Sequence, residues 1–519
     1  QRTPPCQGSC PAGEDIRGWL DIVRGIEKPS GEMSMQEYAF RRATDANPFP
    51  SMMGRVCPAP CQEGCNRNHV DDFVGINAVE QYIGDTAIEN GYSYEAGAST
   101  GKKVAIIGGG PAGMSAAFQL RRMGHDATVF EERAELGGMM RYGIPGYRIP
   151  REKLAAEIGR IVDMGVEVKT NTRVGKDVSV DDLEKDFDAV LWALGCWTGR
   201  GLPVDGWEGT TNCVDGLTFL EAFNNGRMKV TGKKLVCIGG GDTSIDVVSV
   251  ARRIGFNADA GLPEDILRNN ETHDQSLADA AQPTDATLTS LFTKDKMFAA
   301  EHEITDAIEE GVTILDGVMP LEVIVGDDGR ATGLKVCDCT MDGMTPVPTE
   351  GTERIIEADI IVAAIGQGGD MAGVEDYAND RNLIDADKNY QVVDKPGHFV
   401  AGDIVRPHLL TTAIGQASIA AESINSYLLA EKMARRPKVD KHHFSLSEKL
   451  HEAGLEPDEY DKSSLTGTSE MNFAVHNFDD RSQHEIINYD ELFLGHFEQE
   501  DRILRTEDVP NSDQVLGHF

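Results

Sequence analysis

The chain has 519 residues, 40% of them hydrophobic, which is enough for several packed domains. It carries 86 acidic against 49 basic residues, and the formal net charge of -37 repels nucleic acid and anionic membranes. No apolar run reaches the roughly 18 residues of a membrane helix, and no signal segment opens the chain. We therefore expect a cytoplasmic protein without nucleic-acid or membrane partners, whose acidity either solvates its surface or steers a basic partner protein.

Residues 1–98 are expected to be mainly helical and to hold metal. Apolar residues recur at helical spacing in Ile16–Ile26 and in Ile76–Ile88. Five of the ten cysteines crowd into the first 65 residues. In a large cytosolic protein such a group predicts metal ligands rather than disulfides. The cysteines are Cys6, Cys10, Cys57, Cys61 and Cys65.

A first nucleotide-binding unit begins at Lys103. The apolar strand 103–107 runs into Gly108-x-Gly110-x-x-Gly113, a turn whose backbone can approach a pyrophosphate. Glu131 closes the next strand, where a carboxylate can accept both ribose hydroxyls of an adenosine. This combination predicts a bound dinucleotide.

Two distant segments identify that dinucleotide as FAD. Gly137-Gly138 follows Glu131, and Asp403 precedes a helix that is expected to begin near 411–413. The aspartate can bind a ribityl hydroxyl, and the helix N-terminus can stabilise negative charge on a reduced flavin ring.

A second turn, Gly239-Gly240-Gly241, follows the strand Lys234–Ile238 and is expected to bind a nicotinamide dinucleotide. Binding of a 2′-phosphate commonly uses arginines at the end of the next strand, where this chain has Thr293 and Lys294. These residues favour NADH, and NADPH remains the alternative if the pair Arg252-Arg253 reaches the phosphate.

Each nucleotide unit ends in a predicted apolar strand, at 189–195 and at 359–366, and this likeness indicates a weak internal repeat. We predict an iron–sulfur domain at 1–98, an FAD domain at 99–225 and 370–432, a nicotinamide domain at 226–369 and a linker or docking tail at 433–519. Within the third, 256–284 is polar and acidic and is predicted to be a surface insertion. The tail repeats Leu-Gly-His-Phe at 494–497 and 516–519.

Over residues 4–430 the chain resembles the glutamate synthase small-subunit family of iron–sulfur FAD/NAD(P)H oxidoreductases. The resemblance rests on Cys6-x-x-x-Cys10-Pro11, on 54–58 (Gly-Arg-Val-Cys-Pro), on 142–145 (Tyr-Gly-Ile-Pro) and on Gly402-Asp403. It implies an α/β fold with two Rossmann-like domains of the glutathione-reductase type, a helical iron–sulfur domain ahead of them and an extended tail behind. The tail is similar to that of a subgroup associated with dissimilatory sulfite reductase.

The family pattern also implies the cofactor residues. Those expected to bind FAD are Gly108, Gly110, Pro111, Ala112, Gly113, Glu131, Glu132, Gly137, Gly138, Arg141, Ile144, Ala193, Gly195, Gly402, Asp403, Thr411, Thr412 and Ala413. Those expected to bind NADH or NADPH are Gly239, Gly240, Gly241, Asp242, Thr243, Thr293, Lys294 and Gly366.

The family's cysteine region holds [4Fe–4S] clusters. The resemblance implies one cluster on Cys10, Cys57, Cys61 and Glu80, with Gln81 as the alternative fourth ligand. Cys6 and Cys65 would belong to a second cluster, completed by residues ahead of Gln1 or absent, or would serve as alternative ligands. A zinc knuckle built from the same cysteines is the competing interpretation.

In this family hydride passes directly between nicotinamide and flavin, so we expect no catalytic acid or base. No cysteine pair follows Gly137-Gly138, which disfavours a disulfide-reductase mechanism. The predicted function is an NAD(P)H:acceptor oxidoreductase that exchanges electrons with a protein partner such as dissimilatory sulfite reductase or a ferredoxin-like domain. The alternatives are a glutamate synthase small subunit and a non-catalytic assembly subunit. A homodimer or a hetero-complex is expected.

Overall fold

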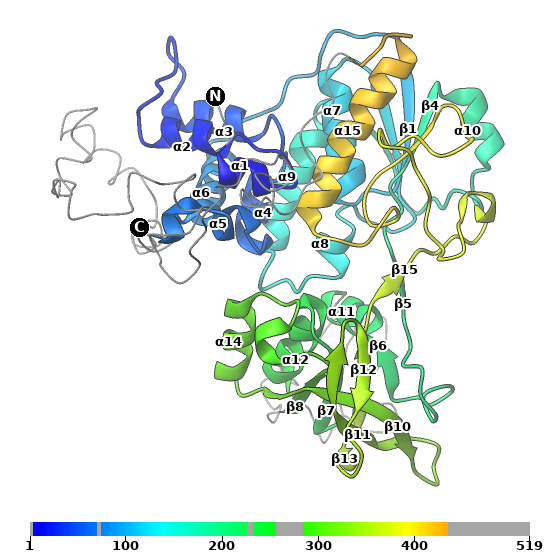
Figure 1. Cartoon of the computed structure of the whole chain (residues 1–519). Helices are drawn as coiled ribbons and strands as arrows, with labels where there is room; N and C mark the ends of the chain where they lie inside the picture. Colours follow the sequence, from blue (N-terminus) through cyan, green and yellow to red (C-terminus); the bar gives the residue numbers. More distant parts are fainter. Residues whose placement is uncertain (1–3, 70–73, 226–231, 256–283, 434–519) are drawn as a thin grey trace, which may run out of the picture. The chain divides into compact units, whose positions relative to one another are not determined.

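The structure is a computed structural model that describes residues 4–69, 74–225, 232–255 and 284–433 (Figure 1). Its contacts group the chain into two units. Of the described residues, unit 1 comprises those up to Leu136, Pro150–Ala193 and those from Ile384 onward, and unit 2 comprises those within Gly137–Ile149 and Leu194–Leu383. The predicted insertion and the predicted tail lie outside the described residues, except for a few residues at their edges.

The N-terminal part of unit 1 is helical, as predicted. Asp15 and Ser34 each start a helix by accepting a hydrogen bond from a backbone N–H of the first turn. The large side chains of Trp19, Phe40 and Phe49 are fully buried. The helices are α1 (Pro5–Ser9), α2 (Ile16–Val23), α3 (Met35–Ala43), α4 (Pro50–Val56), α5 (Pro60–Glu63) and α6 (Ile76–Glu89), with a 3-10 turn η1 at Asn66–His69.

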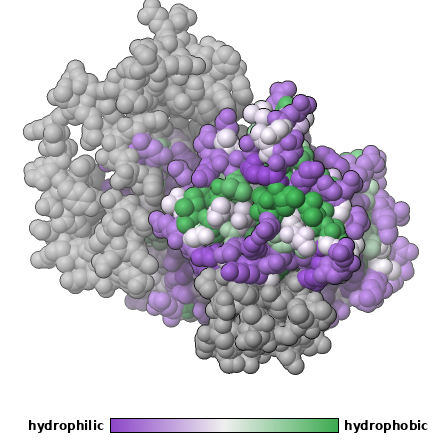
Figure 2. All heavy atoms as spheres, turned by 90° about the horizontal axis from the view of Figure 1, so that it is seen from below, coloured by the Kyte–Doolittle hydropathy of each residue, from purple (hydrophilic) through white to green (hydrophobic). Residues whose placement is uncertain are grey.

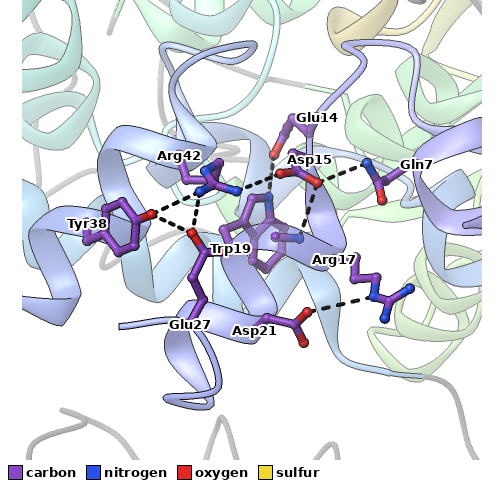
Figure 3. A network of polar contacts seen from close by, with 10 residues as sticks. Gln7, Glu14, Asp15, Arg17, Trp19, Asp21, Glu27, Tyr38 and Arg42 are labelled. Carbon is purple, nitrogen blue, oxygen red and sulfur yellow. Dashed lines mark hydrogen bonds and ion pairs between the residues drawn. The ribbon is translucent and has the colours of Figure 1, made fainter. Parts of the chain in front are cut away.

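A polar network ties α1, α2 and α3 together (Figure 3). The guanidinium of Arg42 bridges Asp15 at 2.9 Å and Glu27 at 2.6 Å, and Gln7 donates to Asp15 at 3.0 Å. Gln7 directly follows Cys6, so this network fixes the chain beside the first cysteines.

Unit 1 also contains a parallel sheet in the order β16-β4-β1-β2-β3. All strand carboxyl ends lie at the same edge, so the loop after each strand meets the others there. The strands are β1 (Lys103–Ile107), β2 (Asp126–Phe130), β3 (Glu167–Lys169), β4 (Ala189–Trp192) and β16 (His398–Val400), and the helices are α7 (Pro111–Arg122), α9 (Arg151–Val162), α10 (Val180–Asp186) and α15 (Leu410–Leu428).

Unit 2 repeats the nucleotide-binding design with a parallel sheet in the order β6-β14-β7-β8-β9. A second, antiparallel sheet packs on its apolar core. The strands are β5 (Thr198–Gly199), β6 (Cys213–Asp215), β7 (Lys234–Gly239), β8 (Asp285–Ser290), β9 (Thr313–Asp316), β10 (Val318–Val325), β11 (Ala331–Asp342), β12 (Thr345–Pro348), β13 (Arg354–Glu357), β14 (Ile360–Ala364) and β15 (Gln367–Gly368). The helices are α8 (Met139–Tyr142), α11 (Gly216–Asn224), α12 (Asp242–Ile254) and α14 (Glu301–Glu309), with 3-10 turns η2 (Lys294–Lys296) and η3 (Glu375–Tyr377).

The predicted fold class is therefore confirmed: both glycine turns join a parallel strand to a helix. Among the described residues, no helix has the length and apolar character needed to cross a membrane.

Candidate functional site

Three cysteines and one glutamate from four different segments line a single cavity in unit 1. Cys10 ends α1, Cys57 ends α4, Cys61 lies in α5 and Glu80 lies in α6. These are the four residues assigned to one cluster, and the structure brings them together. Gln81 is not among the residues that line the cavity.

Close backbone contact between α4 and α6 brings Cys57 near Glu80. A Cβ atom on Gly84 would lie 2.0 Å from the backbone nitrogen of Ser51, and one on Gly54 would lie 2.4 Å from that of Gln81. After Cys57 the chain turns back through Ala59, which has a left-handed backbone at φ 56, and this turn returns Cys61 to the cavity. Side chains at either glycine would push the two ligand segments apart.

Burial makes the thiols of this cavity weaker acids than exposed cysteines. It raises the pKa of Cys57 to about 12 and raises the pKa values of Cys10 and Cys61 well above their usual range, and the other acidic groups of the cavity add to the effect. Thiolates at this depth need a positive charge beside them. An iron cluster supplies that charge, so the donor set fits such a group.

A second buried carboxyl, Glu14, also lines the cavity, and the sequence did not identify it. Burial raises its pKa to about 7, and it hydrogen-bonds with Glu80, whose own pKa is raised by burial and by the charge of Glu14. The only sequence signal was its position four residues after Cys10.

Within the described ranges, no three His, Cys, Asp or Glu side chains are grouped as the ligands of a single ion would be.

Cys6 and Cys65 form a separate pair. Both are half-buried, and burial raises the pKa of Cys6 to about 11, with a further contribution from the nearby Cys65. Neither lines the cavity of Cys10. The structure thus divides the five N-terminal cysteines into the two groups expected from the sequence.

The first glycine turn closes tightly on α7. A Cβ atom on Gly113 would lie 1.9 Å from the carbonyl oxygen of Gly108, so this position needs glycine. Glu131 accepts hydrogen bonds from the backbone N–H of Gly109 at 2.7 Å and of Arg133 at 2.9 Å. The glutamate assigned to a ribose thus also braces the turn.

The C-terminal segment folds back onto this turn, as the FAD assignment requires. A Cβ atom on Gly402 would lie 2.9 Å from that of Ala112, and the N–H of Gly402 donates to Gln416 of α15 at 2.8 Å. Burial raises the pKa of Asp403 to about 6. The backbone after β16 and the first glycine turn therefore lie close together at this edge of the sheet.

The first turn of α15 reaches the cysteine cavity as well. Thr411 lines the cavity, and its hydroxyl lies 3.8 Å from the sulfur of Cys57. The helix start assigned to the flavin and the cavity assigned to the cluster thus share a residue.

The second glycine turn, in unit 2, is equally close-packed. A Cβ atom on Gly239 would lie 2.6 Å from the carbonyl oxygen of Ala364. Ser244, which replaces the third glycine, donates its hydroxyl to the carbonyl of Gly241 at 2.6 Å. The serine therefore stabilises the turn through its hydroxyl.

The two arginines that were the alternative grip for a 2′-phosphate have other partners, at the C-terminal end of α12 and the start of β8. Arg252 donates to the carbonyls of Glu310 at 2.9 Å and Thr284 at 2.6 Å. Arg253 pairs with Glu310 and stacks over Tyr147, 3.7 Å from the ring centroid. The backbone N–H of Lys294 donates to Asp316 at 3.0 Å, which puts a carboxylate beside the loop that follows β8.

The FAD assignments at Gly137, Gly138, Arg141, Ile144 and Gly195 fall in unit 2, whereas the others fall in unit 1. Asn224 of α11 donates to the carbonyls of Tyr142 at 2.9 Å and Gly143 at 3.1 Å. Arg148 pairs with Asp246 of α12 at 2.6 Å and with Glu303 of α14. These anchors were not predicted from the sequence.

Two family models match the chain. Residues 102–417 match the pyridine nucleotide-disulphide oxidoreductase model, and residues 2–92 match that of dihydropyrimidine dehydrogenase domain II, 4Fe-4S cluster.

Curated relatives span most of the chain. The glutamate synthase [NADPH] small chain of Mycobacterium tuberculosis is 32% identical over 84% of this chain and 88% of that protein. The NADP(+)-dependent formate dehydrogenase subunit beta of Moorella thermoacetica is 32% identical over 82% of this chain, which spans only 60% of that subunit. Among solved structures, Mycobacterium tuberculosis FprA in complex with NADPH has a TM-score of 0.53 at 15% identity, covering 71% of this chain and 90% of that one, a likeness of fold.

Proposed function

The chain belongs to the pyridine nucleotide-disulphide oxidoreductase family and carries an N-terminal 4Fe-4S domain, and from this premise we propose that it moves electrons between a nicotinamide dinucleotide and a protein partner. It is an NAD(P)H-dependent iron–sulfur flavoprotein oxidoreductase, with FAD, NAD(P)H and a [4Fe–4S] cluster as its cofactors. The order of transfer, the residue assignments and the partner are the proposal.

When bound, the nicotinamide and the flavin supply hydride transfer, and the cluster supplies one-electron transfer. The protein's share is binding and orientation. The backbone N–H groups at the start of α7 and of α12 bind the pyrophosphates, and Glu131 and Asp403 bind ribose and ribityl hydroxyls. The N-terminal end of α15 stabilises negative charge on the flavin, with Thr411 and Thr412 in its first turn.

The observation that carries the proposal is the 3.8 Å contact between Thr411 and Cys57. It joins the helix start assigned to the flavin with a thiol assigned to the cluster, so electrons have a short route inside unit 1. Cys57 and Thr411 are 354 residues apart in sequence, so only the fold creates this route.

Replacing Cys57 by serine tests the route. Cys57→Ser is expected to lose cluster iron and most electron transfer to a ferredoxin acceptor, while NADH still reduces the flavin at close to the normal rate. Cys213→Ser is the matched control, because Cys213 is a half-buried thiol in β6 of unit 2. A Cys57→Ser protein that loses its iron but still reduces ferredoxin normally would refute the route.

We also propose a preference for NADH. The two relatives named above carry NADP(H) in their names, whereas a dihydropyrimidine dehydrogenase subunit of Escherichia coli, 31% identical over 82% of this chain, is named as NAD-dependent, so the chain's own residues must decide. Thr293 and Lys294 offer no guanidinium, Arg252 and Arg253 are engaged elsewhere, and Asp316 would repel a 2′-phosphate.

The measurement is kcat/KM with each dinucleotide, and Thr293→Arg is expected to raise the value for NADPH. Lys335→Arg, a charge-conserving change at a partly exposed position of β11, is the control. A preference of the unaltered protein for NADPH by about tenfold, about 1.4 kcal/mol, would contradict the proposal.

The partner is proposed to be dissimilatory sulfite reductase, on the similarity of the tail. The relatives are named as subunits, and Figure 2 displays a face where apolar residues gather in a band bordered by hydrophilic ones, a pattern that contact surfaces share. A glutamate synthase small subunit is the second candidate, favoured by the relative that matches over 88% of its length. Co-purification with each enzyme separates the two: binding only to the large glutamate synthase chain would replace the first candidate.

A further inference from the structure

A buried asparagine connects the two carboxyls of the cysteine cavity. Asn47 lies between α3 and α4 and is 0% exposed. Its side-chain nitrogen Nδ2 donates to Oε1 of Glu80 at 2.7 Å and to Oε1 of Glu14 at 3.2 Å. Both carboxyls line the cavity. One amide group therefore holds both acids.

The orientation of this amide is fixed by the backbone. The N–H of Phe49 donates to Oδ1 of Asn47 at 2.9 Å, so the oxygen of the amide faces the backbone and the NH2 group faces the carboxyls. An amide flipped by 180° would set the NH2 group against an N–H and an oxygen against carboxylate oxygens. Asn47 can act here only as a donor toward Glu80 and Glu14.

The two acids are not equivalent in this arrangement. Glu14 is held at both oxygens, since its Oε2 accepts from the indole Nε1 of Trp19 at 3.3 Å (Figure 3). Asn47 engages Glu80 through Oε1, and the other hydrogen-bond partner of Glu80 is Glu14. A bound cluster would take the place of that second partner, whereas both oxygens of Glu14 would keep their bonds from Asn47 and Trp19. The polar contacts thus select Glu80 as the carboxyl that is presented to the cavity.

We infer that Asn47 is a positioning residue for the fourth cluster ligand: its amide holds the Glu80 carboxylate against the cavity and requires an acceptor, hence a carboxylate oxygen, at that place. This inference rests on the proposed cluster site. It also explains the chemistry of position 80. A glutamine there would give its oxygen to Asn47 and turn its NH2 group, which cannot bind iron, toward the cavity.

This inference is tested by exchanging the amide of Asn47 and the carboxylate of Glu80, first singly and then together. Asn47→Asp removes the donor but keeps the oxygen that Phe49 needs, and Glu80→Gln keeps the shape of the side chain. Asn47→Asp is expected to weaken cluster binding about 10- to 100-fold, the usual cost of losing a residue that supports a ligand, and Glu80→Gln at least as much. Release of iron to a chelator measures both. Each should also alter the electron paramagnetic resonance spectrum of the reduced protein.

The double variant distinguishes a positioning role of Asn47 from a general loss of stability. In Asn47→Asp with Glu80→Gln, the new aspartate accepts from the glutamine NH2 and the glutamine oxygen faces the cavity, with the formal charge unchanged. The contact with Glu14 is not restored, so iron release should be slower than in Asn47→Asp alone, which a general packing defect would not produce. Asn90→Asp, at the C-terminal cap of α6, controls for a new charge near this helix.

The outcomes separate the inference from the site. If Glu80→Ala leaves iron release and the spectrum unchanged, Glu80 is not a ligand, and the site assignment fails together with the inference. If Glu80→Ala loses iron but Asn47→Asp behaves as the unaltered protein, only the positioning role is wrong. The positioning role is also wrong if the double variant releases iron at least as fast as the faster of the two single variants.

Discussion

Gly113 has no room for a side chain, and this makes it the sharpest residue-scale test of the first nucleotide turn. A Cβ atom there would lie 1.9 Å from the oxygen of Gly108, a backbone atom that cannot rotate away. Gly113→Ala should cost about 1–3 kcal/mol in the free energy of unfolding, as overpacking does, and should lower the bound flavin per chain. Denaturant midpoints and flavin absorbance measure the two effects.

Gly159 supplies the matched control, because it lies in α9 of the same unit and a Cβ atom there would meet nothing within 4 Å. Gly159→Ala should stabilise the protein by up to about 1 kcal/mol through helix propensity and leave the flavin content unchanged. Equal flavin content in both variants would remove the steric argument for Gly113.

The residues that the sequence identified and those that it missed differ in how far apart their partners lie. Gly108, Gly113 and Glu131 belong to one strand-turn-helix-strand segment, so their spacing carried the information. Asn47 is 33 residues from each of its two acidic partners, and no local pattern marks such a contact. Buried polar residues whose partners come from other elements appear only once the fold is known.

At the scale of elements, Glu157 joins the helical region to the nucleotide-binding region of unit 1. This buried carboxyl of α9 accepts from the backbone N–H groups of Ser51 at 2.8 Å and Met52 at 3.2 Å, at the start of α4. It thereby satisfies donors that an uncapped helix leaves unpaired. Burial raises its pKa from 4.5 to about 8.

This pKa predicts a pH-dependent stability. Between pH 4.5 and about 8 the folded protein keeps the proton on Glu157 and the unfolded chain has lost it. Unfolding then releases a proton, so the stabilising contribution is complete below pH 4.5 and is lost as the pH rises toward 8. The slope contributed is at most about 1.4 kcal/mol per pH unit.

Glu157→Gln should therefore flatten the decline in melting temperature between pH 5 and 8 relative to the unaltered protein. Glu152→Gln, an exposed change on the same helix, should leave the slope as it is. The same slope in all three proteins would mean that Glu157 is ionised in the fold throughout this range.

The bounds of several strands could be predicted from the sequence. Continuous apolar runs predicted β1 at its observed bounds and β7, β4 and β14 to within three residues, because strands covered on both faces are apolar throughout. The grouping of Gly137–Ile149 with unit 2 was not predictable. The contacts that accompany it join Arg148 to Asp246 and Glu303, which lie 98 and 155 residues away.

At the scale of the whole molecule, the parts assigned to cofactors all precede residue 434. Both glycine turns, Asp403 and α15 lie within the described residues, and α15 ends at Leu428. The predicted docking tail lies outside them, and its assignment rests on sequence alone. The two functions, cofactor chemistry and partner recognition, should therefore be separable by truncation.

Removing residues 434–519 should leave NADH-dependent dye reduction within about twofold of normal, a change of about 0.4 kcal/mol in the barrier. Electron exchange with purified sulfite reductase should fall sharply.

In the untruncated chain, Phe497→Ala with Phe519→Ala removes the aromatic group of each Leu-Gly-His-Phe repeat at unchanged charge, and it should reproduce much of the loss. Because the chain carries a formal net charge of -37, rates are to be compared at several salt concentrations. A defect that follows the phenylalanines at every salt concentration assigns docking to the repeats. Unimpaired exchange by the truncated protein would show instead that the partner binds residues 1–433.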